Sequence, residues 1–305
     1  MLWAPVNLLV SLAVKDGASP VAIATTRWCS LAILLGLCLS VPSFRRFTNA
    51  RWPVTKDRVV AVTLGFCFFG PAHAIYYYAI TRTSTFEGNI LGTTAPLWVA
   101  VLSFVLLRER ISRVRVIAIA LGFAGAYVVS VGFAAPSLNQ GHTFGNSLYL
   151  GAVVIESICG VLAIQIARRS SGITTLWLQV VGAAIFLSAA PFVLPGVFPY
   201  TFNGSGATTA FVLTYLVLIS GLVTFGIWYT LAEKAPLSLM VITLLLQPPL
   251  ATGLGMVFLN EKPNLQTAIG SALILVALLI GTLEKGSAPV SVEGVTDRET
   301  DERNG

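Results

Sequence analysis

Three ionisable side chains interrupt the long apolar runs of this sequence: Glu156, Arg27 and His73. Glu156 lies near the middle of the run 147–167, and Gly160 follows at helical spacing, which leaves room beside the carboxylate. An ionised side chain in hydrocarbon costs at least about 2.5–3.5 kcal/mol, so it requires either a partner or a task. The position of Glu156 favours proton coupling or cation binding, and a hydrogen-bonded structural glutamate is the alternative.

Arg27 stands seven residues into the apolar run 20–41. Its planar guanidinium offers a fork of donors that matches a substrate carboxylate. Pairing with Glu156, bonding to a backbone carbonyl, or reaching outward to the membrane surface would each satisfy it equally well.

Aromatic side chains recur at an offset of 152 residues. His73 and Tyr77 share one helical face, and Trp228 and Tyr229 take the places of Tyr76 and Tyr77 in the second half. One interpretation is an aromatic wall around a cavity, with His73 as a titrating group. An aromatic belt at the membrane interface is the other.

Two proline and glutamate pairs show the same offset. Pro96 precedes Glu109 by 13 residues, and Pro248 precedes Glu261 by the same distance. A proline within a helix frees a carbonyl and predicts a kink, whereas the two glutamates, each beside a basic residue, predict ion pairs at loops or gates. The amides expected to line the cavity near these kinks are Asn89 and Gln247.

The composition is that of a membrane protein. Charged residues make up 10% and hydrophobic residues 55% of the chain, and the mean hydropathy is +0.82. The net charge of +6 comes from bases in short loops rather than on one continuous face, which argues against a nucleic-acid partner. The cysteines lie in apolar segments without a CxxC pair or a histidine cluster, so no metal or cofactor is expected. No HExxH, GxSxG or phosphate-loop motif occurs, which argues against an enzyme.

A bilayer core of about 30 Å requires roughly 20 apolar residues in a helix, and this length divides the chain into ten predicted transmembrane helices. The expected segments are 1–14, 20–41, 59–80, 87–107, 114–132, 147–167, 173–194, 208–231, 236–259 and 265–283. With the N-terminus inside, twelve Lys and Arg residues fall in cytoplasmic loops and three fall outside. The sequence therefore predicts an integral membrane protein, of the plasma (inner) membrane, with both termini cytoplasmic.

Each half of the chain contains five predicted helices, an odd number, so the second half enters the membrane upside down relative to the first. The fold class expected is an all-α polytopic membrane protein built as two inverted five-helix repeats, an arrangement typical of transporters. The predicted units are a first repeat, an external linker, a second repeat and a disordered cytoplasmic tail, at 1–132, 133–146, 147–283 and 284–305.

The chain resembles the EamA family of the drug/metabolite transporter superfamily. The resemblance covers both halves, and its most specific features are the Pro96 to Glu109 spacing, its counterpart from Pro248 to Glu261, and Ser19-Pro20 followed by Arg27. It implies ten helices in two inverted repeats that move small metabolites such as amino acids. Glu156 stands where the family pattern has small and polar residues after a tryptophan, a departure from the pattern.

The function expected is that of a secondary transporter, a permease or exporter of an amino acid or related compound, which works by alternating access with protons as a candidate coupling ion. The expected partners are the small-molecule substrate and the lipid bilayer, and the oligomeric state is left open. A passive channel is the alternative, followed by an intramembrane enzyme.

Overall fold

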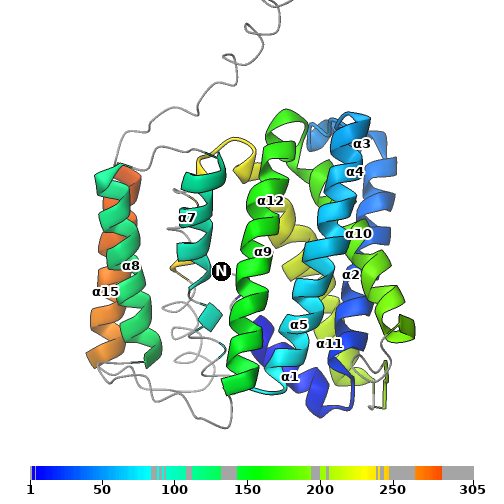
Figure 1. The fold of residues 1–305 in the computed structure, drawn as a ribbon, viewed down its shortest axis with the longest axis horizontal. Helices are drawn as coiled ribbons and strands as arrows, with labels where there is room; N and C mark the ends of the chain where they lie inside the picture. Colours follow the sequence, from blue (N-terminus) through cyan, green and yellow to red (C-terminus); the bar gives the residue numbers. More distant parts are fainter. Residues whose placement is uncertain are drawn as a thin grey trace, which may run out of the picture.

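The computed structural model describes residues 2–3, 5–83, 88, 91–92, 94–107, 112–131, 143–193, 200–203, 206–237, 240, 244–246 and 265–283. Within these ranges the chain is helical, apart from turns and one isolated bridge between Ala18 and Phe202 (Figure 1). Helical stretches long and apolar enough to cross a bilayer are Pro20–Ser40, Thr55–Ile80, Thr143–Arg169, Gly172–Val193 and Ala207–Ala232, and shorter apolar helices are Ala95–Leu107 and Ala268–Ile280. The chain is an all-α polytopic membrane protein.

The helices follow the predicted segments closely. Within the described residues, nine of the ten expected segments contain a helix, and most of 236–259 lies outside these residues. The elements are α1 Val6–Lys15, α2 Pro20–Ser40, α3 Pro42–Phe47, α4 Thr55–Leu64, η1 Gly65–Phe69, α5 Gly70–Ile80, α7 Ala95–Leu107, α8 Arg113–Val131, α9 Thr143–Arg169, α10 Gly172–Val193, α11 Ala207–Thr214, η3 Tyr215–Phe225, α12 Gly226–Ala232 and α15 Leu265–Leu283.

Helix boundaries recur at the 152-residue offset found in the sequence. The pairs of matching boundaries are Pro20 and Gly172, Thr55 and Ala207, Ile80 and Ala232, Arg113 and Leu265, and Val131 and Leu283. The third helix of each half also contains a π-helical segment, η1 in the first and η3 in the second. Because π-helical turns are rare and concentrate at functional sites, their recurrence supports a shared architecture.

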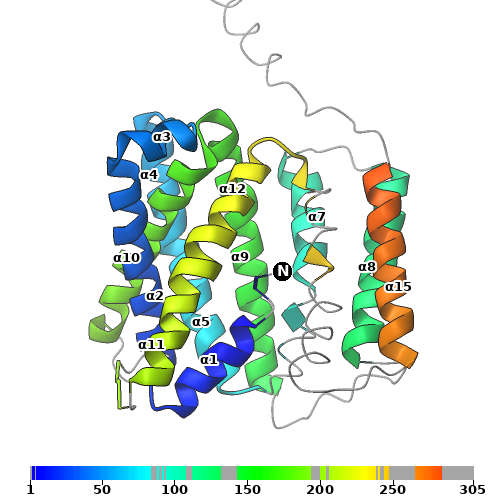
Figure 2. The same ribbon diagram turned by 180° about the vertical axis from the view of Figure 1, so that it is seen from behind.

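Matching helices of the two halves run in opposite directions. In Figures 1 and 2, α4 lies above α5 whereas α11 lies below α12, so the third helices are antiparallel. The α8 and α15 helices also cross antiparallel, because Cβ atoms built on Gly122 and Gly125 would lie 3.3 Å from Ala277 and 2.9 Å from Ile274. The two contacts are symmetric at the 152-residue offset. This is the geometry that inverted repeats require.

Glycines permit the closest approach between the halves. A Cβ on Gly65 of η1 would overlap the carbonyl oxygen of Gln179, and one on Gly182 of α10 would overlap that of Val62. Small residues at such positions let helix backbones meet within a membrane. This contact fixes α10 against α4 and η1, next to the polar residues described below.

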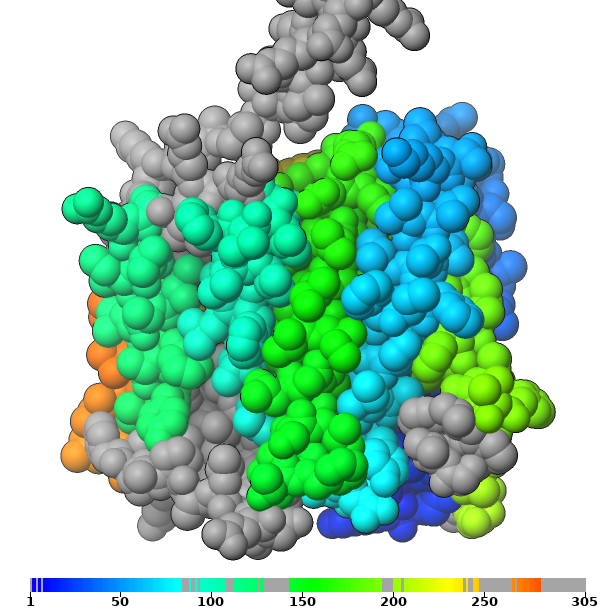
Figure 3. Space-filling model, viewed as in Figure 1, coloured from blue at the N-terminus to red at the C-terminus, as the bar shows by residue number. Residues whose placement is uncertain are grey.

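The outer surface suits a lipid environment. Figure 3 shows α8, α7, α9 and the Thr55–Ile80 helix side by side on one face. Large apolar side chains such as Phe104 and Val105 on α7 and Ile117 on α8 are exposed. Lipid tails are as apolar as these side chains, so the exposure carries no cost in a bilayer.

Candidate functional site

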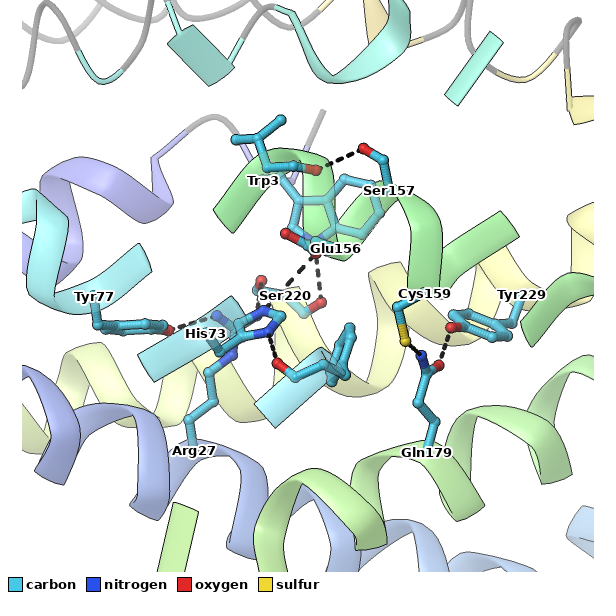
Figure 4. Close-up of polar contacts among 12 residues, drawn as sticks. Trp3, Arg27, His73, Tyr77, Glu156, Ser157, Cys159, Gln179, Ser220 and Tyr229 are labelled. Atoms are coloured by element: carbon cyan, nitrogen blue, oxygen red, sulfur yellow. Dashed lines mark hydrogen bonds and ion pairs between the residues drawn. The ribbon is translucent and has the colours of Figure 1, made fainter. Parts of the chain in front are cut away.

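Arg27 is the buried positive charge of the molecule's central site. It projects from α2 with 3% of its surface exposed, and its two terminal nitrogens donate to the Tyr77 hydroxyl at 2.6 Å and to Ser220 Oγ at 2.9 Å. Its guanidinium carbon lies 4.5 Å from the centre of the Trp28 ring. Arg27 therefore ties α2 to α5 of its own half and to η3 of the other half (Figure 4).

Glu156 faces Arg27 across this site, with His73 beside it. The Nε2 atom of His73 lies 3.8 Å from Glu156 Oε1, and its Nδ1 atom is 2.9 Å from the Phe69 carbonyl oxygen. The Glu156 side chain is 38% exposed, whereas His73 is buried against the rings of Trp28 and Phe69. A Cβ on Gly160, one turn further along α9, would meet no atom within 4 Å. The carboxylate thus faces open space, and the imidazole is held in place behind it.

A second polar cluster mirrors the arginine cluster at the 152-residue offset. Tyr229 of α12 donates to Gln179 Oε1 of α10, as Arg27 of α2 meets Tyr77 of α5. The amide of Gln179 also donates to Cys159 Sγ at 2.7 Å (Figure 4). Position 27 of the first half corresponds to 179 of the second. A hydrogen bond to a tyrosine therefore joins the second and third helices in both halves, but only the first half has a charged residue, Arg27, in this bond.

Aromatic rings from the N-terminal segment complete the site. The Trp3 indole nitrogen donates to the Ser220 carbonyl at 3.3 Å, and its ring packs edge-on against Phe225 at 4.9 Å and Trp228 at 5.8 Å. Trp28 and Phe69 pack against Phe225 as well. The polar groups are consequently enclosed by aromatic side chains contributed by both halves.

Two apolar clusters lie on either side of Glu156 along α9. The first, called the Tyr149 cluster, contains Ala79, Tyr149 and Val153 with Tyr76, Ile80, Leu91, Ala95, Trp98 and Leu148 around them. The second, called the Val161 cluster, contains Val161, Ile164, Ala232, Leu237 and Met240 with Val99, Leu102, Leu107, Trp228 and Ala235 around them. Tyr76 and Trp228 stand 152 residues apart and take part in opposite clusters. The site thus lies between two apolar clusters that share α9 and α7.

Comparison with known proteins shows the family. The profile of the EamA-like transporter family matches residues 1–131 and 143–283, nearly the whole chain. The chain belongs to the EamA-like transporter family.

Relatives of this EamA-family chain include an uncharacterised transporter, YetK, of Bacillus subtilis, 26% identical over 68% of this chain and 63% of YetK. A WAT1-related chloroplastic protein of Arabidopsis thaliana is 25% identical over 68% of this chain and 51% of its own. The matched region therefore spans about half to two thirds of these two relatives. Protein RarD of Streptomyces exfoliatus is 24% identical over 92% of this chain and 84% of its own. A solved crystal structure shares the fold, with a TM-score of 0.73 and 18% identity over 92% of this chain and 93% of that one.

The structure of this EamA-family chain brings together several of the residues singled out from the sequence. Glu156, Arg27, His73 and Tyr77 meet in one site, while Tyr229 belongs to the mirrored cluster. Trp228 reaches the site through Trp3. The residues Asn89, Gln247, Pro248, Glu109 and Glu261 lie outside the described residues.

Pro96 was expected to kink a helix over 87–107, and it is the second residue of α7, which begins at Ala95. Residues 91–92 before α7 are helical, and Thr94 forms a turn between them and α7. A proline in the first turn of a helix costs no hydrogen bond, because the amides there have no partner within the helix. Several residues of 87–107 lie outside the described residues, so the kink at Pro96 stays a prediction.

Sequence reasoning missed the hydroxyl of Ser220, and Gln179 was not among the expected site residues. Ser220 is fully buried in η3, and only its contact with Arg27 distinguishes it from serines that bond to their own helix. Gln179 carried a usable signal, because it occupies the place of Arg27 in the second half. Among the described residues, no group of three or more His, Cys, Asp or Glu side chains is placed to hold a metal ion.

Proposed function

We propose that this membrane transporter is a secondary transporter that moves a small metabolite, an amino acid or related compound, and that Glu156 couples the movement to protons. The observation that carries the proposal is the Glu156 carboxylate, 38% exposed at the centre of the fold, with His73 Nε2 at 3.8 Å. A carboxylate in a membrane interior is costly and marks a substrate or proton pathway by default. The two halves, 1–132 and 147–283, act as the two moving units, joined by the external linker 133–146 and followed by the cytoplasmic tail 284–305.

Charge and shape support an amino acid as the substrate class. Arg27 lies within electrostatic range of Glu156, so one site presents both signs of charge, as a zwitterion requires. The aromatic rings of Trp3 and Trp228 offer an apolar surface next to these charges.

Alternating access follows from the placement of the two apolar clusters. The Tyr149 cluster separates Glu156 from the end of α9 at Thr143, and the Val161 cluster separates it from the end at Arg169. Opening one cluster while the other stays packed would expose the site to one compartment at a time. Because the halves are antiparallel, the same rearrangement carried out by the other half opens the opposite side.

Basic residues identify the proposed cytoplasmic end. Arg51 contacts Ser171, Arg169 lies 3.5 Å from Asp57, and Lys234 lies 3.9 Å from Glu233, so these bases gather at one end of the bundle. Positively charged segments stay on the cytoplasmic side. The plasma membrane is the location proposed, with this end and both termini inside.

The decisive experiment is counterflow in proteoliposomes with a panel of radiolabelled amino acids, nucleosides and sugars. Trans-stimulation by an amino acid supports the carrier, unsaturable flux indicates a channel, and chemical conversion indicates an enzyme. Glu156→Gln is expected to abolish pH-driven uptake while exchange of the same substrate continues. Asp57→Asn, an acidic residue paired with Arg169 at the membrane end, is the control and should keep both activities. Unchanged pH dependence in Glu156→Gln removes this residue as the coupling group.

A further inference from the structure

We propose that hydroxyl and amide side chains on the facing surfaces of α5 and α9 form a polar path that carries protons to Glu156 from the end of α9 at Thr143. The inference rests on the proposed role of Glu156 as the coupling group. It assigns a task to Asn146, Tyr149 and Tyr76, none of which the transport cycle described above requires as a proton carrier.

The outer part of the path is an amide buried at the start of α9. Asn146 is 6% exposed, and its Oδ1 atom accepts a hydrogen bond from the Thr83 hydroxyl, which follows the α5 helix. Its Nδ2 atom is buried and has no hydrogen-bond partner among the described residues. A buried donor without a partner costs about 1–3 kcal/mol, so this amide requires a water molecule or another acceptor. The site is thus suited to hold the first water of a path.

The middle of the path is a pair of tyrosines from the two helices. Tyr149, one turn after Asn146, is 2% exposed, and its ring centre lies 5.0 Å from that of Tyr76. The two side chains are hydrogen-bonded to each other. A Cβ on Gly92 would lie 3.3 Å from the Tyr149 hydroxyl, so the glycine leaves that hydroxyl room. A phenol both donates and accepts, which is what the transfer of a proton along a chain requires.

The inner end of the path reaches the coupling carboxylate. The Tyr76 phenol lies within electrostatic range of Glu156, and its ring centre is 6.4 Å from that of His73. The other charged or titratable groups within electrostatic range of Glu156 are His73 of α5, Arg27 of α2, Cys159 of α9 and Tyr229 of α12. His73 Nε2 lies 3.8 Å from Glu156 Oε1, and Tyr76, which bonds to Tyr149, connects the outer part of the path to this carboxylate.

The path lets protons through a barrier that stops larger molecules. The rings of Tyr76 and Tyr149 pack with Ala79 and Val153 in the Tyr149 cluster, so a solute would have to part these side chains to pass. A proton needs none, because at each step one O–H bond forms as another breaks. In the balanced transfer, a hydronium ion becomes water and the Glu156 carboxylate becomes a carboxylic acid.

The test measures the protonation of Glu156 itself and so needs no substrate. The full-length transporter, in proteoliposomes with the Thr143 face outward, receives a rapid drop in external pH, and infrared difference spectroscopy follows the carboxylic acid band that Glu156→Gln removes. Tyr149→Phe and Tyr76→Phe keep the rings but lose the hydroxyls, and each is expected to slow the band's appearance by about tenfold or more. Tyr78→Phe is the matched control, because Tyr78 lies on α5 and packs against Arg82, 5.4 Å away, and it should protonate at the wild-type rate.

Two results would overturn the path, and they are distinguishable. Wild-type rates in both tyrosine variants, with the band still absent in Glu156→Gln, refute the path and leave Glu156 as the coupling group. An unchanged carboxylic acid band in Glu156→Gln refutes the path together with the proposed role of Glu156. Circular dichroism and retained counterflow in each variant exclude misfolding as the cause of a slower rate.

Discussion

Substitution of Gly182 by alanine should weaken the contact between the two halves of the transporter. A Cβ there would overlap the Val62 carbonyl oxygen and stand 2.8 Å from the Phe66 backbone nitrogen. Gly65 presents the reciprocal contact, where the second-nearest atom, the Gln179 carbonyl carbon, would be 2.8 Å away. All of these are backbone atoms in helices, so no side chain can rotate to make room.

The size of the effect follows from how far the helices must separate. Ordinary Cβ contacts lie at 3.4–4 Å, so α10 would have to move outward by at least several tenths of an ångström, along with every residue it packs. Extra atoms forced into a packed interior cost about 1–3 kcal/mol. The gain from replacing a helical glycine with alanine, about 0.5–1 kcal/mol, opposes this cost. The expected net loss for Gly182→Ala is therefore about 0–2.5 kcal/mol, with the middle of the two ranges giving about 1 kcal/mol.

Gly160→Ala supplies the matched control, because a Cβ there meets nothing within 4 Å and the substitution keeps only the helical gain. Purified variants in one detergent would be compared by thermal unfolding followed through tryptophan fluorescence. Soluble domains shift by about 2–4 °C per kcal/mol, so Gly182→Ala should unfold several degrees below Gly160→Ala. A Gly182→Ala variant that melts at or above the Gly160→Ala variant would refute the claim that backbone contact at this glycine holds the halves together.

Three further changes test individual contacts. Arg27→Gln recreates the Gln and Tyr pair of the second half, so the variant should fold with the hydrogen bond to Tyr77 retained. It should lose substrate affinity, measured as a raised KM in counterflow. An unchanged KM would show that the role of Arg27 is purely structural. Ser19→Ala removes the side chain that caps α2 and should lower stability by about 0.5–2 kcal/mol, seen as an earlier thermal transition. Glu233→Gln removes the charge that accepts the first amide of α10 at 2.6 Å and should cost about 0.3–2 kcal/mol, again by thermal unfolding, whereas wild-type stability would show that the helix dipole contributes nothing here.

The fold could be predicted from the sequence because the length of its apolar runs and their repetition along the chain are visible without any three-dimensional contact. Apolar runs of bilayer length predicted the helices, and the 152-residue offset predicted where the second set begins, as the match between Thr55 and Ala207 shows. The short helix α3, Pro42–Phe47, was not predicted. Its six residues are too few to cross a bilayer and carry two arginines, so a search for long apolar runs passes over it.

The candidate site could be predicted from the sequence only in part. Glu156, Arg27 and His73 were found because charge is scarce in apolar helices, and the structure brings the three together. Ser220 was not found, since a lone serine in an apolar helix most often bonds to its own backbone, and its partner is 193 positions away in sequence. Pro96 is ambiguous for a related reason, because a proline predicts either a bend or a helix start and the apolar run alone does not distinguish them.

The contact between α8 and α15 has a consequence for how such a molecule can be assembled. Gly122 meets Ala277, the counterpart of Gly125, and Gly125 meets Ile274, the counterpart of Gly122. The two helix surfaces are therefore related by a twofold axis in the membrane plane. A half-length chain with only the α8 surface could pair with a second copy of itself inserted in the bilayer in the opposite orientation. Joining the halves in one chain guarantees one half in each membrane orientation. The two halves can then differ in sequence, as they do at Arg27 and Gln179.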